Sequence, residues 1–111
     1  MVIKASIQPR TLDIREQLEG ERFRLVLTGE LDLTTAASLE RAVSAAVAEG
    51  ARELILDVQE LAFVDSTGFR ALLKAKDECA AADVGFAMTR GSEAAQRVFD
   101  ASGIRKRLPF V

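Results

Sequence analysis

The sequence has 111 residues, with 15 basic and 17 acidic side chains, one cysteine and no histidine. This length supports one hydrophobic core, so we expect residues 1–111 to form a single domain. A formal charge of −2 without a basic block argues against nucleic acid as a partner. One cysteine excludes an internal disulfide, and the chain lacks the histidine ligands common in zinc and copper sites. We therefore expect no metal, no cofactor and no histidine-based catalysis.

The apolar runs of this chain are far shorter than the roughly 20 residues that cross a bilayer. The N-terminus also lacks the charged, apolar and small-residue segments of a secretory signal. These features predict a cytoplasmic protein with no membrane contact.

The N-terminal half is predicted to contain a β-hairpin followed by a helix. Hydrophobic side chains alternate over residues 12–18 and 23–27, with polar residues 19–22 between them. After Gly29 the period changes to about 3.6 residues, and Asp32 and Thr34 are candidates to cap the first turn. The helical stripe, which ends at Gly50, consists of Ala36, Leu39, Val43, Ala46 and Val47. Residues 1–10 alternate up to Pro9 and are either a strand or an extra edge segment.

The C-terminal half is predicted to contain two further strands and two helices. Residues 53–58 are apolar on both parities, which is typical of a central strand covered on both faces. A second helical stripe includes Phe69, Leu72, Leu73, Cys79 and Ala80. A strand over residues 84–88 then precedes a short helix from Ser92 to Gly103, and residues 108–111 can add an edge strand. The element order predicts an α/β fold, a mixed β-sheet flanked by α-helices with right-handed crossovers.

The segment over residues 61–70 joins the central strand to the second helix and carries the chemistry. Asp65, Ser66 and Thr67 lie at a helix N-terminus, where unpaired N–H groups favour an oxygen ligand or a phosphate. Gly68 lets another backbone approach closely. Taken alone, these four residues also describe an ordinary helix start with Asp65 as the N-cap.

Three segments in order resemble the STAS domain of bacterial anti-sigma-factor antagonists. They are residues 29–36 (Gly-Glu-Leu-Asp-Leu-Thr-Thr-Ala), residues 56–68 (ending Phe-Val-Asp-Ser-Thr-Gly) and residues 98–104 (Val-Phe-Asp-Ala-Ser-Gly-Ile). The resemblance implies a STAS-like fold and a protein that binds an anti-sigma factor, itself a serine kinase, and so releases sigma factor. It also implies that this kinase phosphorylates Ser66 and ends the binding, and that a metal-dependent serine phosphatase restores it.

The resemblance and the loop chemistry together give a set of candidate residues. Ser66 is the predicted phosphorylation site, with Thr67 in a supporting place. The predicted partner-binding residues are Glu30, Asp32, Asp65, Thr67, Gly68 and Phe69. Phe69 and Arg70 stand where family members often have smaller residues, which predicts a bulkier and more basic surface beside Ser66.

Two other classes of function compete with this interpretation. A small hydrolase or phosphotransferase would have Asp65 and Ser66, but the sequence has no histidine, no Gly-x-x-x-x-Gly-Lys loop and no clustered lysine to activate the serine, so we expect no enzyme activity. The alternative is a STAS subunit of a larger signalling assembly or an accessory protein of a membrane transporter, because a fold does not fix its partner. The sequence is compatible with a monomer or a weak homodimer.

Overall fold

The computed structural model describes residues 11–91, 96–97 and 109 of the chain. Their helices and strands are, in order, β1 (Leu12–Glu19), β2 (Arg22–Leu31), α1 (Ala36–Ala48), β3 (Glu53–Val64), α2 (Ser66–Ala81) and β4 (Gly85–Met88). The sheet order is β1-β2-β3-β4, with β1 antiparallel to β2 and the two other pairs parallel. The predicted mixed α/β fold is confirmed.

The predicted hairpin forms as expected. β1 and β2 pair in register from Leu12 opposite Gly29 to Glu19 opposite Arg22. Gly20 has a φ of +64°, a conformation that glycine adopts without strain, and it starts the two-residue turn between the strands.

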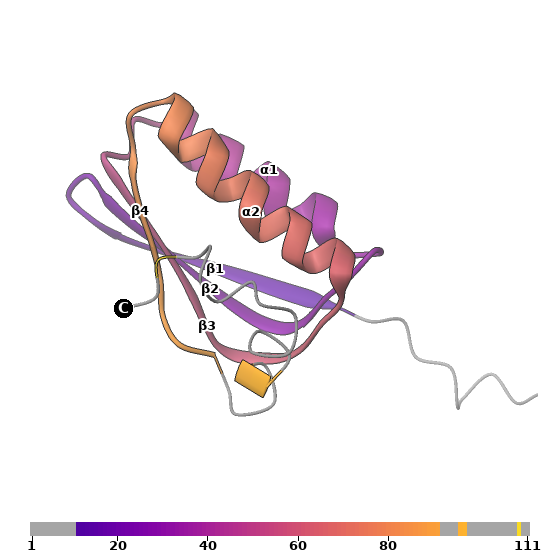
Figure 1. The fold of residues 1–111 in the computed structure, drawn as a ribbon. Coiled ribbons are helices and arrows are strands. Elements are labelled where there is room, and N and C mark those ends of the chain that lie inside the picture. The colour runs from indigo at the N-terminus through magenta and orange to yellow at the C-terminus, as the bar shows by residue number, and fades with distance from the viewer. Residues whose placement is uncertain (1–10, 92–95, 98–108, 110–111) are drawn as a thin grey trace, which may run out of the picture.

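Both helices lie side by side on one face of the sheet (Figure 1). The predicted stripe of α1 is buried at four of its five positions, and Phe69, Leu72 and Cys79 of α2 are buried as expected. Ala80 is exposed, and Ala71 and Ala75 complete the buried face of α2 instead. The core between the sheet and the helices contains the fully buried side chains Leu25, Leu27, Leu39, Leu54, Leu56, Val58 and Leu72.

The opposite face of the sheet carries a polar network around Asp57, whose side chain is 13% exposed. Its carboxylate accepts a hydrogen bond from Arg24 Nη1 at 2.8 Å and another from Thr89 Oγ1 at 3.2 Å. Thr89 Oγ1 in turn accepts from the backbone N–H of Val58 at 3.0 Å. This network joins β2, β3 and the end of β4.

β3 is longer than the sequence pattern predicts. The expected strand covered residues 53–58, whereas β3 continues to Val64 and leaves no loop before α2. Pairing with β2 continues to Leu31 opposite Val64, through register irregularities between Val26 and Thr28 and between Gly29 and Glu30. These irregularities break the alternation that a sequence pattern detects. The strand therefore delivers Asp65 directly to the helix start.

Several predicted elements lie outside the described residues: the segment over residues 1–10, most of the helix from Ser92 to Gly103, and most of the edge strand over residues 108–111. The carbonyl of Pro109 accepts a hydrogen bond from the backbone N–H of Met88 at 3.0 Å, so Pro109 lies beside β4. Among the helices of the described residues, none is long and apolar enough to span a membrane.

Candidate functional site

Asp65 occupies the junction between β3 and α2. It is the N-cap of α2, with extended backbone angles (φ −101°, ψ −174°), and its Oδ1 accepts a hydrogen bond from the backbone N–H of Gly68 at 2.8 Å. This is the ordinary capping role that the sequence allowed for Asp65 beside the predicted partner-binding role, and it satisfies one of the unpaired N–H groups of the first turn.

The second carboxylate oxygen of Asp65 reaches a different part of the chain. Oδ2 accepts a hydrogen bond from the backbone N–H of Leu33 at 3.3 Å. The backbone N–H of Asp65 also donates to the carbonyl of Leu31 at 3.2 Å. Asp65 thus joins the connection between β2 and α1 to the start of α2, and it brings two of the three resembling segments into one site.

Asp32 is a buried residue that forms hydrogen bonds within the connection between β2 and α1. It is 5% exposed, and its Oδ1 accepts from the backbone N–H of Thr34 at 2.9 Å and from Thr34 Oγ1 at 2.7 Å. Thr35 Oγ1 accepts from the backbone N–H of Asp32 and donates to the carbonyl of Glu30. The N-cap position of α1 is Thr35, without a side-chain capping bond, so the expectation that Asp32 or Thr34 caps this helix was wrong. Their side chains close the preceding turn instead.

Ser66 presents an exposed side chain at the first residue of α2, and Thr67 beside it is half-buried. Arg70, one turn further along α2, is also exposed. Thr67 and Arg70 border a hollow of about 230 Å³ together with Ala36, Glu40, Ala71 and Lys74. Ser66 therefore lies at the surface of the molecule, at the start of α2.

Gly68 and Phe69 face inward. A Cβ on Gly68 would lie 2.4 Å from the carbonyl oxygen of Leu31 and 2.9 Å from Cγ1 of Val64. The close backbone approach predicted at Gly68 therefore occurs within this chain. Phe69 is only 8% exposed and packs in the core, so it does not enlarge the surface beside Ser66 as expected. Arg70 is exposed, so it is the member of this predicted pair that contributes to the surface near Ser66.

Two exposed apolar residues of this region escaped the sequence analysis. Leu33 is 74% exposed and Phe63 is 39% exposed. Leu33 precedes the apolar stripe of α1, which begins at Ala36. An apolar residue outside such a stripe is seldom part of the core, so the sequence pattern could have indicated that Leu33 is exposed. Phe63 gave no such signal, since it lies in the irregular part of the β2–β3 register.

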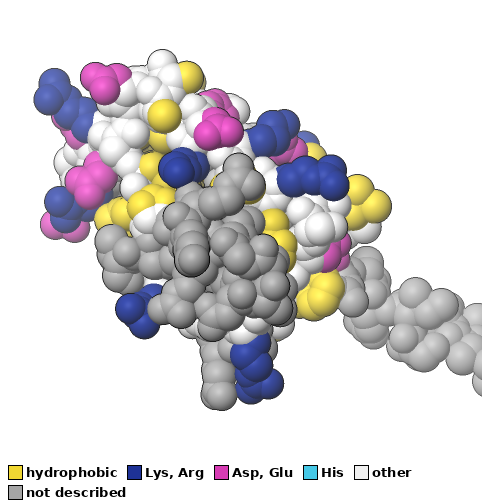
Figure 2. Space-filling model, viewed as in Figure 1, with side chains coloured by type: hydrophobic (Ala, Val, Ile, Leu, Met, Phe, Trp, Pro, Cys, Tyr) yellow, Lys and Arg dark blue, Asp and Glu magenta, His cyan; other side chains and the backbone are white. Residues whose placement is uncertain are grey.

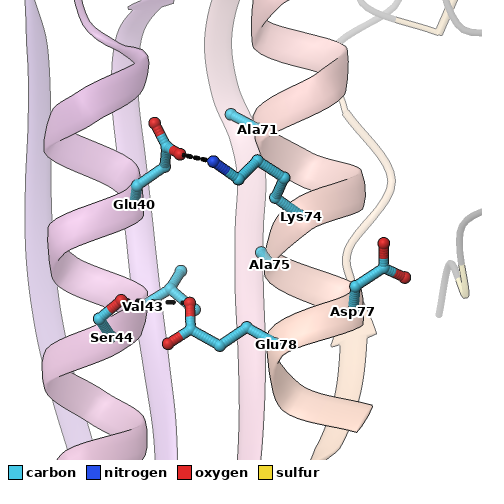
Figure 3. A pocket seen from close by; sticks show the side chains of 8 residues that line it. All are labelled: Glu40, Val43, Ser44, Ala71, Lys74, Ala75, Asp77 and Glu78. Carbon is cyan, nitrogen blue, oxygen red and sulfur yellow. Dashed lines mark hydrogen bonds and ion pairs between the residues drawn. The ribbon is translucent and has the colours of Figure 1, made fainter. Parts of the chain in front are cut away.

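A groove of about 280 Å³ separates α1 from α2 (Figure 3), and polar residues pair across it. Lys74 Nζ forms an ion pair with Glu40, and Ser44 Oγ donates to Glu78 Oε1 at 3.1 Å. The hydrogen bond and charge of Glu40 raise the pKa of Lys74, so this amine stays protonated. The two pairs thus link α1 to α2 across the groove, and the protonated Lys74 amine is not available as a base.

Cys79 is a core residue, as predicted. Burial, and to a lesser extent the charge of Glu78, raises the pKa of its thiol to about 11, so it remains protonated and unreactive at neutral pH. Within residues 11–91, 96–97 and 109, no group of three or more histidine, cysteine or acidic residues is arranged to hold a metal ion.

Comparison with known proteins agrees with this geometry. The profile of the STAS domain matches residues 13–111. The chain belongs to the STAS domain family. It is 32% identical over 82 residues to the anti-sigma-F factor antagonist RsfB of Mycobacterium tuberculosis; the match covers 74% of this chain and 66% of the relative, just under two thirds of its length.

Several solved structures share the fold. An anti-sigma factor antagonist from Mycobacterium paratuberculosis superposes with a TM-score of 0.79 at 24% identity, covering 90% of this chain and 85% of that one. The phosphorylated form of the Bacillus cell fate determinant SpoIIAA superposes with a TM-score of 0.66 at 24% identity, covering 91% of each chain. A sulfate transporter family protein from Wolinella succinogenes gives 0.68 at 16% identity, covering 85% and 80%.

The two bonds of the Asp65 carboxylate make a stability prediction. We expect Asp65→Ala to lower the free energy of unfolding by about 1 to 2 kcal/mol, because the N–H groups of Gly68 and Leu33 lose their acceptor. Asp65→Asn should lose less, since its amide oxygen can still cap the helix. Urea unfolding of the three proteins measures the difference, and equal losses for Ala and Asn would contradict the capping role.

A second prediction concerns Gly68. Gly68→Ala should lower the free energy of unfolding by about 1 to 3 kcal/mol, because its Cβ would collide with the backbone carbonyl of Leu31. Gly85→Ala is the matched control, since a Cβ there would meet its nearest atoms at 3.6 Å, an ordinary contact. Urea unfolding that finds both variants as stable as the wild type would refute the tight contact.

Proposed function

We propose that this chain is an anti-sigma-factor antagonist. It binds an anti-sigma factor that is also a serine kinase, releases the sigma factor by that binding, and loses the binding when the kinase phosphorylates Ser66. The observation that carries this proposal is the exposed Ser66 side chain at the first residue of α2, next to the fixed Asp65 cap, in a chain of the STAS family.

The position of Ser66 allows phosphorylation with little cost to the fold. The side chain is exposed, and the first turn of a helix carries a partial positive charge that favours an anion. A phosphate there adds about −1.5 to −2 charges without entering the core. Phosphorylation is therefore expected to change the surface and leave the packing intact.

The same charge is expected to weaken partner binding. The phosphate would lie on the residue next to Asp65, whose carboxylate is held in place by the bonds from Gly68 and Leu33. An acidic or tightly packed partner surface is then repelled or forced to dehydrate the phosphate.

The other predicted partner-binding residues fall into two groups, half-buried and buried. Glu30 and Thr67 are half-buried and can touch a partner directly. Asp32, Gly68 and Phe69 are buried, so their influence on binding passes through the shape of the β2–α1 connection and of the first turn of α2. A metal-dependent serine phosphatase, a cytoplasmic location and the absence of enzyme activity complete the proposal.

The second candidate is a STAS subunit of a larger signalling assembly or an accessory protein of a membrane transporter. The similarity to the sulfate transporter family protein favours it, because the same fold occurs in that setting. The exposed Ser66 favours the sigma-factor circuit, since a scaffold has no need of an accessible hydroxyl at this position.

The test is phosphorylation by the kinases of the chain's own organism. The purified protein is incubated with ATP, magnesium and each anti-sigma-type serine kinase, and phosphate is located by mass spectrometry. We expect one modification, at Ser66, by a kinase that also binds the unmodified protein. Stable binding to some other protein with no phosphorylation would instead support the scaffold.

Matched variants separate the two hydroxyls. Ser66→Ala should abolish phosphorylation and retain kinase binding, whereas Thr67→Ala should still be phosphorylated. Ser66→Asp should weaken binding less than phosphate does, because a carboxylate carries less charge and fewer oxygens. Phosphate that persists on Ser66→Ala would disprove the assignment of Ser66.

A further inference from the structure

Arg70 is an exposed basic residue to which the proposed function gives no role. It lies on α2 four residues after Ser66, whose side chain is also exposed. Residues four apart lie on the same face of an α-helix, with their Cβ atoms about 5 to 6 Å from each other. Long side chains on a helix also lean toward its N-terminus. The Arg70 guanidinium is therefore within reach of a group attached to Ser66 Oγ.

The acidic residues of this region already have partners. Glu40 borders the same hollow as Arg70, but its carboxylate pairs with Lys74 Nζ (Figure 3). The carboxylate of Asp65, next to Ser66, accepts hydrogen bonds from two backbone N–H groups. Within residues 11–91, 96–97 and 109, Arg70 forms no hydrogen bond or ion pair of its own. Its guanidinium donors are thus available to a new anion.

Arg70 is the one basic residue among the first eight residues of α2, 66–73. The next, Lys74, lies two turns beyond Ser66 and is engaged with Glu40. On the face that Figure 2 shows, basic and acidic side chains are mixed over the described surface, and the whole chain has a formal charge of −2. A phosphate on Ser66 therefore meets a single nearby cation and no broad positive field.

We propose that Arg70 binds the phosphate on Ser66 within the same chain, through hydrogen bonds from its guanidinium to the phosphate oxygens. A negative group four residues before a positive one is the favourable order on a helix. The planar fork of guanidinium N–H groups also matches two phosphate oxygens. This inference rests on the proposed function, because it requires a phosphate on Ser66, and it adds a residue that stabilises the phosphorylated state.

The pair changes the charge of the phosphate as well as its position. The attraction to Arg70 is stronger for the dianion than for the monoanion, so the pair favours loss of the second phosphate proton. The ordinary second pKa of phosphoserine, about 6, lies close to neutral pH. Arg70 thus keeps the phosphate fully charged at neutral pH, and it draws the phosphate along α2, away from the carboxylate of Asp65.

The test is a phosphorus-31 NMR titration of the full chain with genetically encoded phosphoserine at position 66, which needs no kinase. We expect Arg70→Gln to raise the second pKa of this phosphate by about 0.3 to 1, because a neighbouring opposite charge is lost. Arg70→Lys, which keeps the charge and loses the fork, should raise it less. The partial positive charge of the helix start acts equally in all forms and cancels in the comparison.

Lys74→Gln is the matched control. It removes the same charge from the same helix, but it lies eight residues, or about 12 Å, from Ser66, which is beyond the screening length at about 0.15 M salt. We expect it to change the phosphate pKa by less than about 0.2. The amide spectrum of each variant checks the fold, which the exposed position of Arg70 leaves intact.

An unchanged phosphate pKa in Arg70→Gln would overturn the inference, as would equal rises in Arg70→Gln and Lys74→Gln, because these indicate a general effect of net charge. Neither result touches the proposed function, since the titration involves no partner. The proposed function fails on different evidence, namely a wild-type chain that no anti-sigma-type kinase binds or phosphorylates on Ser66.

Discussion

The carboxylate of Asp65 accepts hydrogen bonds from the backbone N–H groups of Gly68 and Leu33, at 2.8 and 3.3 Å. One bond caps α2 and the other holds the connection that leads into α1. The close contact between Gly68 and the carbonyl of Leu31 fixes the spacing of the same two segments, since even a methyl group would not fit between them. The rest of the site depends on these contacts, because they hold the backbone at the start of α2, where Ser66 lies, and the backbone at Leu33.

Rigid contacts of this kind suit a switch in which the fold stays constant. The sheet and the two helices bury a core that Ser66 does not enter, and the polar network of Asp57 secures the far side of the sheet. A phosphate added at the start of α2 therefore has no packed element to displace. In the proposed switch, its effect would be concentrated at the surface that a partner contacts.

Much of the fold followed from the periodicity of the sequence. The hairpin and both helices were predictable because their apolar residues recur at intervals of two or about 3.6. The ordinary reading of Asp65 as an N-cap was also available from the sequence, because a short carboxylate at a helix start can accept a hydrogen bond from the first turn. The end of β3 was not, since the register irregularities near Thr28 and Glu30 disturb the alternation.

The candidate site was only partly predictable, because it forms by tertiary pairing. The bond from Leu33 to Asp65 depends on Leu31 and Val64 lying opposite each other in a parallel register, which no local pattern specifies. Phe69 was placed both on the apolar stripe of the second helix and on the partner surface beside Ser66, and only the first placement is correct, because the first turn of α2 directs Gly68 and Phe69 inward. The exposure of Leu33 and Phe63 was not predicted, because the tertiary pairing, and not the local sequence, decides which apolar residues of this region stay at the surface.

The central claim is that phosphate on Ser66 controls partner binding without altering the fold. The most direct measurement titrates the cognate kinase with two purified forms of the chain, one with serine and one with genetically encoded phosphoserine at position 66, and records the amide spectrum of each form. We expect a dissociation constant at least about tenfold higher for the phosphorylated form, with spectral changes confined to the neighbourhood of Asp65 and Leu33. Equal dissociation constants for the two forms, or a phosphorylated form that has lost its folded spectrum, would contradict the central claim.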